Sequence, residues 1–324
     1  MKKISKILIL CLILVLAVSC GKSKSNQKIK IVLDWVPNTN HTGLYVAKDL
    51  GYFKEEGLDV EIVQPPEGST TALIGAGGAE FGISFQDTLA KSFANENPVP
   101  VTAVAAILQH NTSGIISLKE KGIDSPKKLE GKKYATWEDN IEQAILKKLV
   151  TDDKGDFSKV KLIPYTITDV VTGLKTDVDA VWVYYAWDGI ATERAGLQTN
   201  FLKIRDYGEE LDYYSPVIIA NNDFLKKNPE IAKKVLKAIK KGYEYAMKNP
   251  EESAKILVKN SPELDINLVT ASQKWISKEY QSDAKEWGII DGNRWNRFYE
   301  WLYKNKAVER EIPKDFGYSN EYLK

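Results

Sequence analysis

Two short segments of this chain concentrate aromatic, amide and acidic side chains. The first reads DWVPNTNHTG over residues 34–43. Trp35 offers a flat apolar face, the Asn38 amide can donate and accept, and the His41 imidazole does either according to its tautomer. Together they could bind a flat ring with hydrogen-bonding groups along its edge. The alternative is structural: Trp35 packs within a lobe, Asn38 holds a turn and Asp34 braces the loop.

The second segment reads YAWDG over residues 185–189 and adds a carboxylate and two rings. Asp188 can accept a hydrogen bond from an amine on a ring edge, and this bond is charge-assisted where the ring is protonated. Tyr185 or Trp187 can supply the second face of an aromatic sandwich. The alternative is that the segment forms the first turn of a helix. The Asp188 carboxylate then interacts favourably with the helix dipole, and Tyr184 and Trp187 are buried.

Three more aromatic side chains are candidates because of their places in the chain. Trp137 follows a predicted strand over residues 133–136, although core packing accounts for it equally well. Tyr213 and Tyr214 lie where we expect the chain to cross between two lobes, so they can reach a cleft there. The run Ser69–Thr71 at a predicted helix start suits either an anion or plain helix capping.

The composition excludes several kinds of function. With 45 Lys and Arg against 44 Asp and Glu, the formal net charge is +1, so no basic excess favours nucleic acid. Two His and two Cys are too few for a structural zinc site, a disulfide framework or a Cys-His catalytic pair, so we expect no metal site. The 324 residues exceed the size at which one hydrophobic core stops growing, which predicts two lobes.

Short β-rich runs alternate with helical segments up to about residue 220, which predicts an α/β fold with mainly parallel strands. From Asn222 onward the pattern is almost wholly helical, with predicted helix starts at Pro229, Pro250 and Pro262. The predicted strands cover residues 29–33, 60–63, 81–84, 99–106, 114–118, 133–136, 160–163 and 180–183, and the predicted helices among them cover 42–50, 70–74 and 141–150, with another beginning at 125–126.

This order predicts two lobes that the chain crosses twice. Residues 28–112 and 216–324 form lobe 1, residues 113–215 form lobe 2, and a ligand binds in the cleft between them. The lysines over residues 226–248 alternate with apolar residues at helical spacing, which indicates a solvated helix face and not a nucleic acid site. We expect a monomer.

The first twenty residues carry export signals. Three lysines precede an apolar run from Ile7 to Val18, which is shorter than the roughly 20 apolar residues of a membrane span. The end of the run, LAVSC, resembles a bacterial lipobox. We therefore predict a signal peptide over residues 1–19, lipid on Cys20, a polar tether over 20–27 and an extracytoplasmic, membrane-anchored protein. Ordinary cleavage beside an incidental Cys20 is the alternative.

Longer motifs resemble one family. The 34–43 run, GYFKEEGL over 51–58 and NDFLKKNPE over 222–230 are similar to the thiamine-pyrimidine branch of the periplasmic-binding-protein superfamily. Its exported members serve ABC importers, and its fungal relatives synthesise the thiamine pyrimidine. The resemblance implies a hinged two-lobed fold without cofactor or catalysis, which captures hydroxymethylpyrimidine or formylaminopyrimidine and delivers it to an ABC permease. The fungal stretch equivalent to residues 212–216 looks cysteine-rich, whereas this chain has no Cys there.

Several alternatives stay open. The cargo could be intact thiamine, whose cationic thiazolium needs a π face or a carboxylate, or more distantly riboflavin or an alkanesulfonate. A sulfonate site favours arginine, and none of the chain's arginines lies in the aromatic clusters. The alternatives of other classes are a pyridoxal-phosphate-dependent pyrimidine synthase with His41 as a reacting group, and a structural lipoprotein that binds no small molecule.

Overall fold

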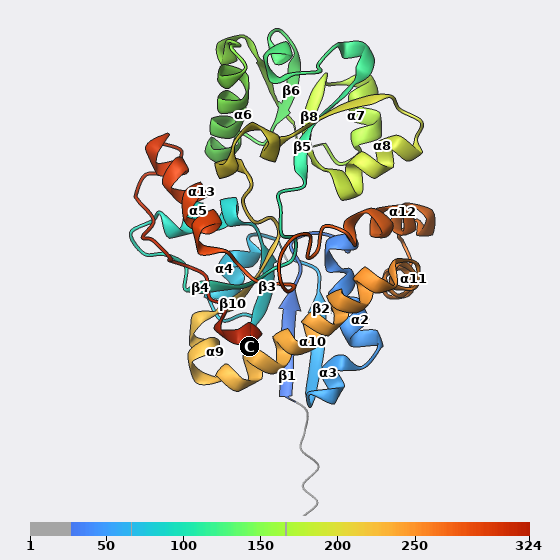
Figure 1. Ribbon diagram of the computed structural model, residues 1–324, viewed down its shortest axis with the longest axis vertical. Helices are drawn as coiled ribbons and strands as arrows, with labels where there is room; N and C mark the ends of the chain where they lie inside the picture. Colours follow the sequence, from blue (N-terminus) through green and yellow to red (C-terminus); the bar gives the residue numbers. More distant parts are fainter. Residues whose placement is uncertain (1–26, 66, 166) are drawn as a thin grey trace, which may run out of the picture.

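A computed structural model describes residues 27–65, 67–165 and 167–324 and has two lobes, each built on a five-stranded sheet (Figure 1). Lobe 1 contains the sheet with strand order β2-β1-β3-β10-β4, and lobe 2 the sheet with order β7-β6-β8-β5-β9. The predicted signal peptide, Cys20 and all of the tether except Gln27 lie outside the described residues. Gln27 is the first residue of β1.

The strands are short and their central residues are mostly buried, because β-branched and aromatic side chains recur along them. Their bounds are β1 (Gln27–Val32), β2 (Leu58–Val63), β3 (Phe81–Ser84), β4 (Val101–Ala106), β5 (Ser113–Leu118), β6 (Lys133–Thr136), β7 (Lys161–Pro164), β8 (Ala180–Tyr184), β9 (Thr199–Lys203) and β10 (Val217–Asn221).

Helices cover both sheets and form most of the region after β10 (Figure 1). Several begin at a side-chain cap, such as Ser69, Asp139 and Asp265, which accept from backbone N–H groups of the first turn. Their bounds are α2 (Thr42–Asp49), α3 (Tyr52–Glu55), α4 (Thr70–Gly75), α5 (Gln86–Phe93), α6 (Asn140–Asp152), α7 (Val170–Thr176), α8 (Ile190–Arg194), α9 (Asn222–Lys227), α10 (Pro229–Lys248), α11 (Pro250–Asn260), α12 (Ile266–Ile276) and α13 (Gly292–Lys304).

The α/β class is confirmed, but both sheets are mixed where mainly parallel strands were predicted. In lobe 1, β1 pairs in parallel with β2 and β3, whereas β10 is antiparallel to β3 and β4. In lobe 2, β6 is parallel to β7 and β8, and β5 is antiparallel to β8 and β9. The antiparallel pairs arise because the chain changes sheet, so that β10 inserts between β3 and β4.

Two further predictions differ from the structure. Pro229 and Pro250 are the first residues of helices, but Pro262 lies in a turn and α12 begins after the Asp265 cap. The segment beginning at Ser125 and Pro126 forms a short 3₁₀ turn, Pro126–Leu129, instead of an α-helix. In the described part of the chain, none of the helices is both long and apolar enough to cross a membrane.

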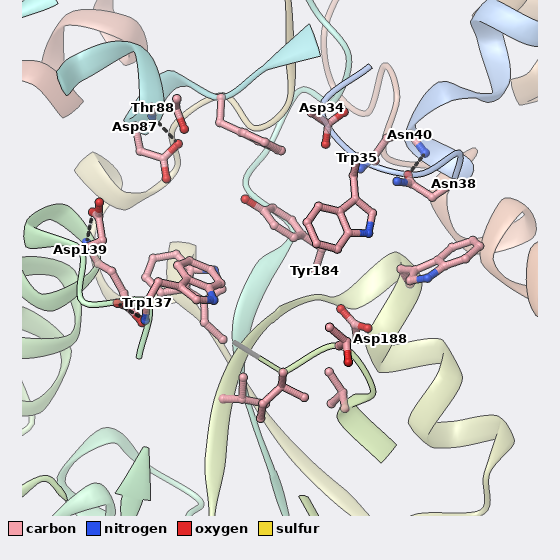
Figure 2. Close-up of a pocket in the computed structure, with 18 of the residues that line it drawn as sticks. Asp34, Trp35, Asn38, Asn40, Asp87, Thr88, Trp137, Asp139, Tyr184 and Asp188 are labelled. Carbon is pink, nitrogen blue, oxygen red and sulfur yellow. Dashed lines mark hydrogen bonds between the residues drawn. The ribbon is translucent and has the colours of Figure 1, made fainter. Parts of the chain in front are cut away.

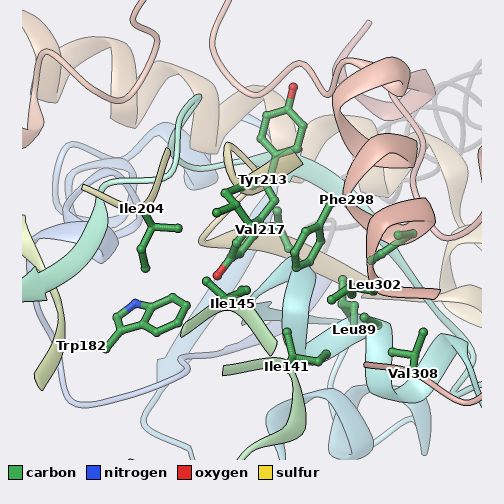
Figure 3. Packing of buried hydrophobic residues seen from close by; sticks show 14 of the residues in the cluster. Leu89, Ile141, Ile145, Trp182, Ile204, Tyr213, Val217, Phe298, Leu302 and Val308 are labelled. Carbon is green, nitrogen blue, oxygen red and sulfur yellow. The ribbon is translucent and has the colours of Figure 1, made fainter. Parts of the chain in front are cut away.

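The chain leaves lobe 1 after β4, enters lobe 2 at β5, and returns between β9 and β10. One apolar cluster spans this junction, as Figure 3 shows. Trp182 and Ile145 from lobe 2 belong to the same cluster as Leu89 and Phe298 from lobe 1. The junction therefore has a packed core, and the cleft opens beside it.

Candidate functional site

A cavity of ≈ 540 Å³ lies between the lobes (Figure 2). Its walls come from segments that follow the carboxyl ends of β1, β3, β6, β7 and β8, the usual position of ligand sites in α/β sheets. Lobe 1 contributes Asp34, Trp35, Asn38, Asn40, Phe85, Asp87, Thr88 and Lys91, and lobe 2 contributes Trp137, Asp139, Glu142, Ile167, Thr168, Val170, Val181, Trp182, Tyr184, Trp187 and Asp188.

The loop after β1 is held by its own polar side chains. The Asn38 side chain accepts from the Asn40 N–H at 2.9 Å and donates to the Val36 carbonyl at 3.1 Å. His41 Nδ1 accepts from the Asn38 N–H at 3.2 Å, so its Nε2 carries the proton of the neutral ring and donates to Asp34 Oδ1 at 2.7 Å. The loop is therefore fixed from inside, with Trp35 projecting into the cleft (Figure 2).

Aromatic faces line both sides of the cavity. Trp35 is 56% exposed and Trp137 44% exposed, which is unusual for such large apolar side chains. Trp137 lies against Trp182 with ring centroids 5.7 Å apart. Across the lobes, Phe85 stacks on Tyr184 at 5.7 Å and an interplanar angle of 24°. These exposed faces can stack on a flat ring.

A buried carboxylate positions Trp137. Glu142 accepts from the Tyr134 hydroxyl at 2.9 Å, the Thr136 hydroxyl at 2.8 Å and the Trp137 N–H at 3.0 Å. Burial raises the pKa of Glu142, and these hydrogen bonds oppose that effect. The next residue, Glu138, has a left-handed backbone with φ of 59°. The loop after β6 is thus held in a defined conformation that leaves the Trp137 ring facing the cavity.

Three carboxylates in the cavity have oxygens free of protein partners among the described residues. Asp34 uses only Oδ1, for His41, and Asp87 only Oδ1, for the Thr88 N–H at 2.8 Å. No hydrogen bond or ion pair of Asp188 occurs within the described ranges. Burial raises the pKa of Asp87 to about 6, with a smaller contribution from nearby Asp139. Burial likewise raises the pKa of Asp188 to about 6.

The cationic side chain in the cavity wall is already paired. Lys91 on α5 of lobe 1 forms an ion pair with Asp139, the cap of α6 in lobe 2. With five carboxyl groups and this one lysine among the lining residues, the wall is acidic. Trp182 adds a buried indole N–H without an acceptor in the described part of the chain. An amine-bearing or cationic ring therefore matches the site better than an anion does.

The structure brings together Trp35, Asn38, Trp137, Trp187 and Asp188 in the cavity wall, as Figure 2 shows for the labelled ones. The other four predicted side chains lie outside it. His41 is 0% exposed behind the loop after β1. Tyr185 packs on Phe201 and Trp275 and hydrogen-bonds to Glu193.

Tyr213 and Tyr214 point into the packing of α13 instead of the cleft. Tyr213 stacks on Phe298 with centroids 4.0 Å apart (Figure 3). The Tyr214 hydroxyl accepts from the Asp291 N–H at 2.8 Å. Both tyrosines are buried because α13, which lies about eighty residues later in the chain, covers the second crossing.

Four residues of the cavity wall were not predicted from the sequence, namely Phe85, Asp87, Asp139 and Glu142, and Tyr184 was expected only as a buried residue. A signal for the first two was present, because Phe85 directly follows the predicted strand over residues 81–84 and Asp87 comes two residues later. The role of Glu142 depends on its contact with Thr136 six residues earlier. No group of three or more His, Cys, Asp or Glu side chains in the described ranges could hold a metal ion.

Comparisons with known proteins agree with this architecture. The formylaminopyrimidine-binding protein of Halalkalibacterium halodurans is 27% identical over 328 residues, which cover 97% of this chain and 98% of that protein. The 4-amino-5-hydroxymethyl-2-methylpyrimidine phosphate synthase THI11 of Saccharomyces cerevisiae is 29% identical over 319 residues, covering 92% and 88% of the two chains. The resemblance predicted from the motifs is thus confirmed.

Solved structures share the fold. The alkanesulfonate-binding protein SsuA from Xanthomonas axonopodis pv. citri, bound to MOPS, matches with a TM-score of 0.68 at 12% identity, over 90% of this chain and 98% of that one. SsuA from Escherichia coli matches with a TM-score of 0.67 at 15% identity, over 88% and 90%. These matches confirm the two-lobed periplasmic-binding-protein fold. Because a family model described as NMT1/THI5 like matches residues 38–253, this chain belongs to the NMT1/THI5-like family.

Proposed function

We propose that this protein is the solute-binding component of an ABC importer and that it captures an amino-bearing pyrimidine between its lobes. The observation that carries the proposal is the cavity itself, which combines exposed indole faces with carboxylate oxygens from both lobes. A 4-aminopyrimidine ring can stack on Trp35 or Trp137 while its amine donates to Asp188. The name of the Halalkalibacterium halodurans relative supports formylaminopyrimidine, with hydroxymethylpyrimidine as the second candidate.

The acidic wall argues against an anionic cargo. A sulfonate would face five carboxyl groups, and the lysine of the wall is paired with Asp139. The cationic thiazolium of intact thiamine suits the same wall, so thiamine is the alternative cargo within this role. Riboflavin needs no such cluster of carboxylates.

A pyrimidine synthase is less well supported by the geometry. His41, the candidate reacting group for that chemistry, is buried and does not line the cavity. Both of its ring nitrogens are engaged, one by the Asn38 N–H and the other by Asp34. We therefore assign His41 a positioning role in the loop after β1.

The test is a fluorescence titration of the purified protein, since four of its eight tryptophans line the cavity. Formylaminopyrimidine, hydroxymethylpyrimidine, thiamine, riboflavin and taurine are titrated in parallel. We expect saturable quenching by an aminopyrimidine, weakened at least tenfold in Trp35→Ala and unchanged in the control Trp301→Ala on α13. Saturable binding of taurine alone, or of no compound, would refute the proposed cargo.

Membrane anchoring through Cys20 and delivery to a permease belong to the same proposal. Metabolic labelling with a radioactive fatty acid should mark the wild type and leave Cys20→Ser unlabelled. Equal labelling of both proteins would contradict the anchor. Cells without the protein should lose uptake of the labelled pyrimidine at low external concentration, and uptake at an unchanged rate would contradict the transport role.

A further inference from the structure

A buried chain of hydrogen bonds crosses the cleft through α12. The Thr39 and Ser272 hydroxyls lie 2.6 Å apart, and the Ser272 hydroxyl donates to the Ala186 carbonyl of lobe 2. Because Ser272 has one hydroxyl proton and gives it to Ala186, the Thr39 hydroxyl is the donor to Ser272. Thr39, Ser272 and Ala186 are 1%, 0% and 4% exposed, so water does not compete for these bonds.

This series of hydrogen bonds ends at two segments whose residues line the cavity. Thr39 lies between Asn38 and Asn40, and its carbonyl accepts from the Tyr280 hydroxyl at 2.5 Å. Ala186 lies in the single-turn π-helix η5 (Tyr185–Gly189), the turn that also carries Trp187 and Asp188. Such π-turns are rare and concentrate at functional sites. One serine therefore connects the ligand loops of both lobes.

The position of α12 suits a connector. It packs on α11 and on the 3₁₀ turn Thr39–His41 in lobe 1, and it also contacts η5 and α8 in lobe 2. Figure 1 shows α12 along the upper edge of lobe 1, on the side that faces α8 of lobe 2. Trp275 on α12 adds an aromatic contact with Tyr185, with ring centroids 5.2 Å apart. If the lobes separated at this edge, the Ser272 to Ala186 hydrogen bond would break.

We propose that Ser272 is a positioning residue for ligand binding, which stabilises the closed arrangement of the lobes by joining the Asn38–Asn40 loop to the turn that carries Trp187 and Asp188. This inference rests on the proposed function in that the cleft it closes is the ligand site. Ser272 touches no ligand in this scheme. It shifts the equilibrium between open and closed lobes, and the closed form holds the ligand.

The test compares Ser272→Ala with Ser277→Ala. Ser277 is a matched control because it is also buried and its hydroxyl hydrogen-bonds within lobe 1, with the Gln273 carbonyl at 2.6 Å as the nearer acceptor and the Ala246 carbonyl at 3.1 Å. Small-angle X-ray scattering of the ligand-free proteins needs no knowledge of the cargo. We expect a larger radius of gyration for Ser272→Ala than for the wild type, and no change for Ser277→Ala.

Stopped-flow fluorescence with formylaminopyrimidine provides the second measurement. Loss of one buried hydrogen bond should make ligand dissociation roughly 2- to 12-fold faster in Ser272→Ala, with little change in the association rate. Thr39→Val removes the other hydroxyl isosterically but leaves the Ser272 to Ala186 hydrogen bond in place, so its effect should be smaller than that of Ser272→Ala. Equal scattering of Ser272→Ala and the wild type, or equal dissociation rates in the two serine variants, would overturn the inference. If no pyrimidine binds, the proposed function fails while the scattering comparison still decides the role of Ser272.

Discussion

The junction between the lobes contains a histidine held by two carboxylates, and its removal gives a sharp prediction. His110 Nδ1 lies 2.6 Å from Asp212 Oδ2, and its Nε2 lies 2.9 Å from Asp283 Oδ1. Both nitrogens can donate only when the imidazole is protonated. The hydrogen bond to Asp212 is the largest cause of the raised pKa of His110, while burial and nearby Arg294 oppose it.

Because the pKa of His110 is raised, the way in which the stability of the fold depends on pH can be derived. The stability that the protonated ring contributes is fully present below the ordinary histidine pKa of about 6.5. It is lost as the pH rises through the higher pKa of the folded protein. The pKa of Asp212 is lowered although burial opposes this, since His110, Arg294 and the Asn111 N–H all favour its ionised form. That carboxylate therefore stays charged throughout the neutral range.

Most of the stability that His110 contributes comes from one of its two contacts, the one with Asp212. The Asp283 side chain is 73% exposed, so its bond contributes little, whereas the Asp212 side chain is 19% exposed. A hydrogen bond to a charged group contributes about 1.5–3 kcal/mol and a neutral one about 1 kcal/mol. We expect His110→Asn to lower the free energy of unfolding by about 2 kcal/mol at pH 5.5 and by about 1 kcal/mol at pH 9.

Urea unfolding of the wild type and His110→Asn at pH 5.5, 7 and 9 measures this difference directly. Taking the difference between the two proteins cancels titrations that they share. The sequence has only two histidines, so the variant also assigns the imidazole NMR signal that titrates above pH 6.5 in the wild type. A stability difference that is constant with pH, or that grows as the pH rises, would refute the doubly bonded, protonated ring.

Two further predictions concern the cavity and the second crossing. Burial raises the pKa of Asp188 to about 6, so this carboxyl group ionises between pH 5 and 7. The ratio of wild-type to Asp188→Asn affinity for the pyrimidine, measured by calorimetry, should therefore rise roughly tenfold over this pH range. A ratio that does not change with pH would contradict Asp188 as the hydrogen-bond acceptor. Tyr214→Phe loses the hydrogen bond from the Asp291 N–H, so it should lower the free energy of unfolding in urea by about 1 kcal/mol and leave ligand affinity unchanged. Weaker ligand binding by this variant would instead indicate that Tyr214 belongs to the binding site.

Local signals in the sequence predicted where most elements lie, but not how they pair. The strands at residues 81–84 and 133–136 were predicted with the observed bounds, because short β-rich runs mark them. The antiparallel insertion of β10 between β3 and β4 depends on contacts more than one hundred residues apart in the chain. The prediction missed β9, whose pairing with β5 is also non-local.

For the candidate site residues too, the sequence predicted positions along the chain better than contacts with distant segments. The position of Tyr213 at a crossing between lobes was predicted, yet the direction of its side chain depends on α13, whose Phe298 stacks on it. Most of the cavity wall lies at or just after the carboxyl ends of strands, Trp187 and Asp188 included, although Tyr185 of the same segment packs on Phe201 and Trp275. Position at a strand end was therefore a better guide to the cavity than aromatic character alone.

The density of polar side chains in the loop after β1 has a physical explanation in the structure. Asn38 caps the following turn, and His41 closes the loop by accepting from the Asn38 N–H and donating to Asp34. These polar groups mostly satisfy one another, which leaves the Trp35 ring and one oxygen of Asp34 for the cleft. A rigid loop of this kind presents a fixed aromatic face before the ligand arrives, so closure has only to bring Trp187 and Asp188 to it. The ordering within lobe 1 and the Ser272 bridge across to lobe 2 are thus two parts of one arrangement, in which preorganisation precedes closure.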